Sequence, residues 1–162
     1  MILVWVRVDD RLIHGQVAVG WTRAVGATRI VVADDDAAGN TMQQTLLKMA
    51  APSGVEVSVL SVADAAQALL TDRFARDKVM LIVRGPEPLL QIVAAGVPIE
   101  RVNVGNVGMA EGSKRVSREM AANETELAAW KELDRRGIVL EGRWLPGSGP
   151  TNVNKALQAF KS

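Results

Sequence analysis

Residues 9–17 read Asp-Asp-Arg-Leu-Ile-His-Gly-Gln-Val and join an apolar run to an amphipathic one. The run before them, residues 1–8, is rich in β-branched side chains and predicts a strand. After them, apolar side chains within residues 16–25 recur at helical spacing, which predicts a helix. A strand, a loop and a helix in this order are typical of a parallel α/β sheet, in which ligands bind at the carboxyl ends of strands. We therefore expect His14, the only histidine, to lie at that edge.

The rest of the chain repeats this alternation of short apolar runs and helical patterns. Further strands are expected at residues 28–33, 55–60, 78–83 and 99–104, with a more exposed strand at 114–120 and an edge strand at 138–145. The alternation predicts a single domain over residues 1–162. Its fold class is α/β, a three-layer α/β/α sandwich around a mostly parallel sheet of about six to seven strands.

Helices are expected between these strands, and their starts are marked by capping residues. Asn40, Ser61 and Asn123 each precede a helical pattern, and the last helix is expected at residues 151–161. In the helix that Asn40 caps, the apolar side chains should form the buried face: Met42, Leu46, Met49 and Ala50.

The composition excludes several classes of function. The 19 basic and 18 acidic residues nearly cancel and form no basic block, so we expect no nucleic-acid surface. With no cysteine and one histidine, a thiolate nucleophile and a transition-metal site of the usual kinds are excluded. No run of about 18 apolar residues exists to span a membrane, and charges from Arg7 onward interrupt the apolar start. We expect a cytoplasmic protein.

His14 and its neighbours combine the groups that phosphoryl transfer requires. Arg11 lies three residues away, Gly15 permits close approach of the backbone, and the helix start at Gln16 offers unpaired N–H groups. The guanidinium and the helix start both disfavour a protonated ring, and both would stabilise a phosphoryl group on it. The alternative interpretation is a structural histidine that caps or packs against the helix.

Two acidic stretches flank this chemistry. Asp9 or Asp10 could orient Arg11 or accept the far ring N–H of His14, and the spacing does not say which; a solvated turn is the alternative. Residues 34–36 are three aspartates after the second strand; they suit either Mg²⁺ or the start of a helix, and we favour the helix start. No metal ligand and no cofactor is predicted.

A glycine-rich loop, residues 105–112, leaves the fifth strand. It lacks the ending of a nucleotide P-loop, because Gly112-Ser113-Lys114 has the wrong order. We expect its first residues, Gly105 and Asn106, to contribute to phosphate binding together with the backbone at Gly15 and Gln16.

Residues 9–17, followed by Trp21, closely resemble the active-site segment of the IIB subunits of the bacterial phosphoenolpyruvate-dependent sugar phosphotransferase system (PTS), in the mannose/fructose/sorbose family. The likeness extends to residues 29–32, 45–47, 51–55, 101–105 and 136–138, and so covers nearly the whole chain. It implies an α/β/α sandwich in which His14 accepts a phosphoryl group on Nδ1 and Arg11 contacts the phosphate.

The resemblance also implies partners. We expect no IIA domain fused to this chain, so the donor would be a phosphohistidine on a separate IIA protein. The acceptor would be a sugar carried by the membrane subunits IIC and IID, which would hold the protein at the inner face of the membrane. The loop from Gly105 to Met109 looks closer to the amino-sugar branch than to the mannose transporters, so the sugar stays open.

Two other functions remain as hypotheses. One is a non-catalytic regulatory module in which phosphorylation of His14 only reports sugar status. The other is a Rossmann-like protein that binds a nucleotide or small anion, although no acidic residue stands at the position that such a fingerprint requires.

Overall fold

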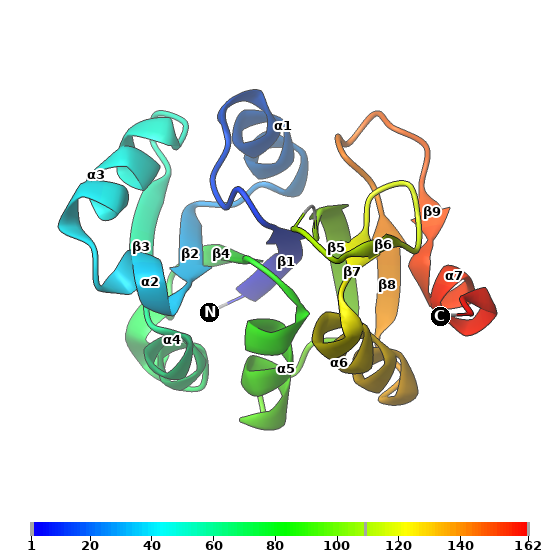
Figure 1. The fold of residues 1–162 in the computed structure, drawn as a ribbon. Coiled ribbons are helices and arrows are strands. Elements are labelled where there is room, and N and C mark those ends of the chain that lie inside the picture. The colour runs from blue at the N-terminus through cyan, green and yellow to red at the C-terminus, as the bar shows by residue number, and fades with distance from the viewer. Residues whose placement is uncertain (1, 109, 162) are drawn as a thin grey trace.

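The computed structural model describes residues 2–108 and 110–161, and within them the strands form one seven-stranded sheet and one short hairpin (Figure 1). The large sheet has the order β3-β2-β4-β1-β5-β8-β9. All of its pairs are parallel except β8 with β9, so the sheet is mostly parallel, as predicted. The strands are β1 (Ile2–Asp9), β2 (Arg29–Ala33), β3 (Glu56–Leu60), β4 (Lys78–Val83), β5 (Arg101–Asn106), β8 (Val139–Gly142) and β9 (Thr151–Asn152).

Helices cover both faces of this sheet, which confirms the three-layer α/β/α architecture (Figure 1). One face carries α1 (Gly15–Val25) and α3 (Thr41–Ala50), and the short α2 (Asp35–Ala38) packs beside α3 and β3. The opposite face carries α4 (Val62–Leu69), α5 (Pro86–Ala94) and α6 (Glu124–Arg135). The last helix, α7 (Val153–Ala159), packs against α6 and β8, and a 3-10 turn spans Asp72–Phe74. Across the described residues, no helix has the length and apolar character needed to cross a membrane.

Two apolar clusters hold the layers together, one on each face. The larger cluster packs α4, α5, α6 and α7 onto the sheet and includes the fully buried Leu89, Ile92 and Trp130. The smaller cluster lies under α1 and α3 and includes Trp21 and Leu47. Strand β4 contributes to both, which explains why its sequence is apolar without interruption.

The predicted helix starts at Asn40, Ser61 and Asn123 are confirmed. Each side chain accepts a hydrogen bond from the backbone N–H three residues later, at 3.0, 3.1 and 2.8 Å. At α6 the cap is reciprocal, because the carboxylate of Glu126 accepts the N–H of Asn123 at 3.1 Å.

The predicted buried face of α3 is wrong at three of its four positions; the fourth, Ala50, is partly buried and packs against the smaller apolar cluster. Met42, Leu46 and Met49 are each more than half exposed, and Leu47 is the residue that packs under the helix. Leu47 and Ala50 lie three residues apart, as one helix face requires, so spacing could not decide between this face and the predicted one; the contact of α3 with β3 does.

Other boundaries also differ from the sequence-based expectation. Strand β5 spans Arg101–Asn106 and not 99–104, because Asn106 still pairs with Asp9 of β1, so Gly105 and Asn106 end the strand and do not begin the loop. Residues 114–120 do not form one strand, because the chain turns at 116–120 to pair β6 (Lys114–Arg115) with β7 (Ala121–Ala122) in a hairpin. Strand β8 ends at Gly142 and is not an edge strand, since β9 pairs along its outer side. The last helix starts at Val153 and not at 151, because the two residues before it form β9.

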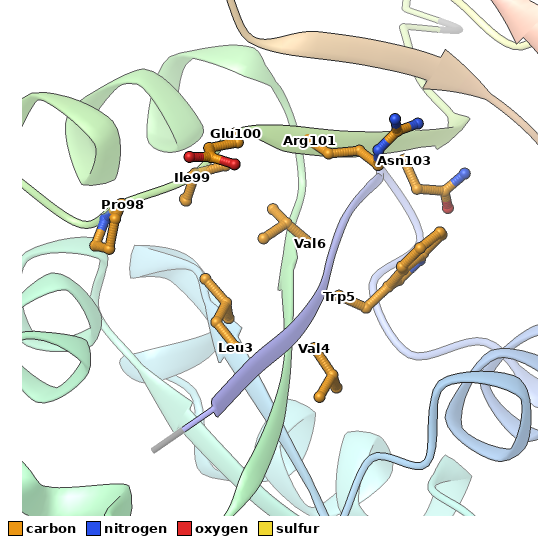
Figure 2. Close-up of a pocket in the computed structure, with 9 residues that line it drawn as sticks. All are labelled: Leu3, Val4, Trp5, Val6, Pro98, Ile99, Glu100, Arg101 and Asn103. Carbon is orange, nitrogen blue, oxygen red and sulfur yellow. The ribbon is translucent and has the colours of Figure 1, made fainter.

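Strands β1 and β5 pair only from Arg7 onward, at Arg7 with Asn103 and at Val8 with Val104. Before that point they separate, and a cavity of about 280 Å³ opens between the amino half of β1 and residues 98–103. Figure 2 shows Trp5 and Asn103 beside it. None of the predicted site residues lines this cavity.

Candidate active site

His14 lies at the carboxyl edge of the sheet, between the end of β1 and the first residue of α1. Its backbone is extended, with φ −137° and ψ 99°, and it occupies the capping position of α1 without a side-chain capping bond. The side chain is exposed, and its ring makes no hydrogen bond or ion pair with any described residue. The structural alternative, a capping or packed histidine, therefore does not describe this ring.

The start of α1 presents free backbone donors next to His14. The carbonyl of His14 accepts the N–H groups of Val17 and Ala18, at 3.0 and 3.3 Å, while those of Gly15 and Gln16 have no acceptor among the described residues. Gly15 has φ +40°, and a Cβ built there would meet nothing within 4 Å. Open space and unpaired donors at a helix start together suit an anion.

The loop that carries His14 is tight and anchored. The N–H of Leu12 donates to the carbonyl of Asp9 at 3.0 Å, and Leu12 has φ 58°, which is unusual for a residue other than glycine. The side chains of Leu12 and Ile13 are buried in the smaller apolar cluster, whereas those of Arg11 and His14 are exposed. Packing of the two apolar side chains therefore holds the two polar ones at the surface, and strain of this kind concentrates at functional sites.

Of the two aspartates, Asp9 is the one that contacts Arg11. Its Oδ1 accepts the backbone N–H of Arg11 at 3.0 Å and the Nε–H at 3.3 Å. Asp10 instead pairs with β5: its N–H donates to the carbonyl of Asn106 at 2.9 Å, and its Oδ1 accepts from Nδ2 of Asn106 at 3.2 Å. Neither carboxylate bonds to the His14 ring. Of the two roles expected for these aspartates, orienting Arg11 or accepting the ring N–H of His14, the structure contains only the contact with Arg11.

Gly105 and Asn106 lie close to this loop but in different ways. Gly105 is buried against the guanidinium of Arg7, and a Cβ at this position would overlap it. Asn106 is half-buried and ties β5 to Asp10. The contribution of either residue to phosphate binding stays a prediction.

The acidic run at residues 34–36 is the start of a helix, as favoured above. Asp34 caps α2 through a hydrogen bond from the N–H of Ala37 to Oδ2, at 3.0 Å. Its two oxygens also accept from Nε and Nη2 of Arg84, at 3.0 and 3.1 Å. Within the described part of the chain, no group of three or more His, Cys, Asp or Glu residues is placed to hold a metal ion.

Arg84 is a site residue that sequence reasoning missed. It follows β4 directly, and its Nη1 donates to the carbonyl of Asp10 at 3.0 Å, which links the end of β4 to the loop of β1. Hydrogen bonding to Asp34 raises the pKa of Arg84. Together with Asp10, Asp34 and the start of α5, it lines a cavity of about 350 Å³ at this edge. The signal available in the sequence was its position, immediately after a buried strand.

Arg7 was also missed, although it is the one charged residue in the apolar run of residues 1–8. It is 2% exposed, and its Nη2 donates to Oδ2 of Asp9 at 3.0 Å. Burial lowers the pKa of Arg7, and the charge and hydrogen bond of Asp9 oppose that effect. A charged residue in a buried strand is almost always paired with an opposite charge. The position of Arg7 in an apolar strand therefore indicated that an acidic side chain lies beside it.

Comparison with known proteins places the chain in one family. The family model described as "PTS system sorbose subfamily IIB component" matches residues 3–162. The fructose-specific EIIB component of Bacillus subtilis is 36% identical over 158 residues, and the match covers 98% of this chain and 97% of that protein. The mannose-specific EIIAB component of Escherichia coli is 38% identical over 143 residues; this chain spans only 44% of that longer protein.

A solved structure extends the likeness to three dimensions. The IIBSor domain of the sorbose permease from Klebsiella pneumoniae superposes with a TM-score of 0.91 at 30% identity, covering 98% of this chain and 97% of that domain. A fold shared over the full chain, and a family model that matches all but its first two residues, lead to one conclusion: the chain belongs to the sorbose-subfamily IIB components of the PTS.

Proposed function

We propose that the protein is a phosphocarrier that accepts a phosphoryl group on Nδ1 of His14 from a phosphohistidine of a IIA partner, and passes it to a sugar during uptake. The observation that carries this proposal is the state of His14: an exposed ring without a partner in the described structure, at a helix start, beside Arg11. IIB components of this family are phosphotransferases, and a free imidazole at an anion-binding helix start is what such a step requires.

In the proposed step, the lone pair of Nδ1 forms a bond to phosphorus while the bond between phosphorus and the donor nitrogen breaks. The donor imidazole leaves with that electron pair and takes up one proton, while the ring of His14 gives up the proton on Nε2, so the total charge and the number of phosphoryl groups are unchanged. Arg11 and the N–H groups of Gly15 and Gln16 would offset the charge on the transferring oxygens. Asp9 and Asp10 would hold the loop, and Gly105 and Asn106 would close the site from β5.

The reaction would need neither a nucleotide nor a divalent metal ion. The phosphoryl group arrives already activated on a donor imidazole, so no polyphosphate has to be cleaved or shielded. Positive charge at the site would come from Arg11 and backbone donors, which are permanent parts of the chain.

The second transfer would take place at the membrane. The sugar is of the mannose, fructose, sorbose or amino-sugar class, carried by the IIC and IID permease subunits, and relatives are named for mannose, fructose, sorbose and N-acetylgalactosamine. The protein would be cytoplasmic and associate with the inner face of the membrane through those subunits. No nucleic acid would be involved.

The test is transfer from a purified phosphorylated IIA protein in excess EDTA and without ATP, for the wild type and for His14→Ala. We expect full transfer to the wild type and none to the variant, whose thermal unfolding should match the wild type because the His14 ring has no partner among the described residues. Phosphate on the variant, or transfer that requires Mg²⁺, would contradict the proposal. Adding membranes with IIC and IID then tests the sugar step; a phosphorylated protein that passes nothing on would be a regulatory module instead.

A further inference from the structure

The strongest feature outside the proposed chemistry is the buried guanidinium of Arg7. Its side chain is 2% exposed, and the carboxylate of Asp9 beside it is fully buried. Removing two charges from water costs several kcal/mol per ion, and their mutual attraction offsets this only when the geometry is good and the remaining donors are satisfied. A buried pair of this kind is weak evidence for stability, so its presence calls for another explanation.

The surroundings of Arg7 hold its guanidinium in one orientation. Nη1 donates to Oδ1 of Asn103 on β5 and to the carbonyl of Arg143 at 3.1 Å. Nη2 donates to Asp9 and, at 3.3 Å, to the carbonyl of Trp144, and the ring of Trp21 on α1 lies 5.6 Å from the guanidinium carbon. The backbone of β5 reaches the guanidinium because Gly105 has no side chain.

The carboxylate of Asp9 connects this buried arginine to an exposed one. Oδ2 receives Arg7 and Oδ1 receives Arg11, so each oxygen serves a different guanidinium. Arg11 is held only at its backbone N–H and its Nε, and 40% of its side chain is exposed. Within residues 2–108 and 110–161, neither of its terminal nitrogens has an acceptor. The end of the guanidinium is therefore free for two oxygens of a phosphoryl group.

We infer that Arg7 is a positioning residue for phosphoryl transfer: by holding Oδ2 of Asp9, it leaves Oδ1 to hold Arg11 at the phosphate. This inference rests on the proposed function. Arg7 itself is too deeply buried to touch a phosphoryl group on His14, so its effect passes through Asp9 and Arg11. Small displacements of a group that binds the transition state are costly, on the order of 100-fold for about 1 Å.

A double-mutant cycle on the single-turnover rate of transfer tests this inference. In the wild-type background Arg7→Lys keeps the charge but loses the forked contacts, and we expect a fall of about 100-fold. In an Arg11→Gln background the same substitution should change the rate by less than about twofold, since the group that it positions is gone. Equal fold-changes in the two backgrounds would overturn the inference and reduce Arg7 to a structural residue.

The matched control is Arg29→Lys. Arg29 is half-buried, donates from Nε to Asp77 at 2.8 Å, and starts β2 at the opposite edge of the sheet. This variant should keep the wild-type rate, and a comparable loss there would also contradict the inference. If Arg7→Lys does not fold, Asn103→Ala serves in its place: it removes one acceptor of Arg7, keeps the ion pair with Asp9, and should lower the rate by about tenfold only while Arg11 is present.

A second donor separates this inference from docking and from the proposed function. Phosphoramidate transfers phosphoryl groups without a protein surface, and the Arg7→Lys loss should persist with it; a loss seen only with phosphorylated IIA would place Arg7 in donor docking and overturn the inference. A wild type that neither donor phosphorylates would refute the proposed function itself. If the wild type is phosphorylated but Arg7→Lys lowers the transfer rate by the same factor in the wild-type and Arg11→Gln backgrounds, only the role of Arg7 is refuted.

Discussion

The two faces of β1 differ in chemistry over its last four residues. Val6 and Val8 point into the apolar cluster under α5 and α6, whereas Arg7 and Asp9 point to the other side, where they form a buried ion pair. Alternate residues of a strand face opposite sides of the sheet, so a single segment serves both purposes. At its carboxyl end, therefore, one face of β1 carries apolar core residues, while the other carries the buried ion pair that we infer positions Arg11.

Asp9→Asn should have the largest effect, because it acts on both functions of the polar face. The amide keeps the size of the carboxylate but leaves Arg7 buried without its counter-charge, and we expect a loss of about 3–5 kcal/mol in the free energy of unfolding. The transfer rate should fall as well, since Arg11 loses its anchor. Denaturant unfolding and quench-flow transfer measure the two losses. An unchanged stability would show that the carbonyls and Asn103 hold Arg7 without Asp9.

Arg11→Ala should separate the two functions. The side chain is exposed, so the free energy of unfolding should change by no more than about 0.5 kcal/mol. Loss of one charge contact on a transferring phosphoryl group should lower the rate by about 100- to 1,000-fold. Arg11→Lys should restore only part of the rate, because an ammonium group lacks the paired donors. Rates for lysine equal to those of the wild type would exclude a two-oxygen contact.

Ile92→Val is the smallest change and reports on the apolar face alone. Ile92 is fully buried on α5, in the cluster that Val6 and Val8 share. Removing one methyl group should cost about 0.5–1.5 kcal/mol in the free energy of unfolding and leave the transfer rate at the wild-type value. A loss of rate here would mean that the two faces of β1 are coupled, contrary to the comparison.

Much of the fold was predictable because it depends on local signals. The uninterrupted apolar residues of β4 and the capping residues Asn40, Ser61 and Asn123 predict elements that the structure contains. The orientation of α3 was not predictable, because Leu47 and the exposed methionines lie on different stripes of the same helix and only packing on β3 chooses between them. Strand β9 was missed for a related reason: two residues carry no period, and their antiparallel pairing with β8 is a tertiary contact.

The site was predictable where its residues are neighbours in sequence and not where they are distant. His14, Arg11 and Asp9 fall within six residues, so their proximity follows from the chain itself. Arg84 reaches Asp10 across 74 residues, and Arg7 reaches Asn103 across 96. These contacts depend on the order in which the strands enter the sheet, with β1 between β4 and β5, and the single sequence does not specify that order.

The most direct test of the account maps the phosphoryl group on the wild-type protein. Trypsin cleaves after Arg11 and Arg23, so His14 lies in the peptide of residues 12–23, which holds one histidine. After incubation with phosphorylated IIA in EDTA, fragmentation of that peptide at neutral pH should place one acid-labile phosphoryl group on His14. A phosphoryl group on any peptide that lacks His14, or a protein that carries none after full exposure to the donor, would contradict the account.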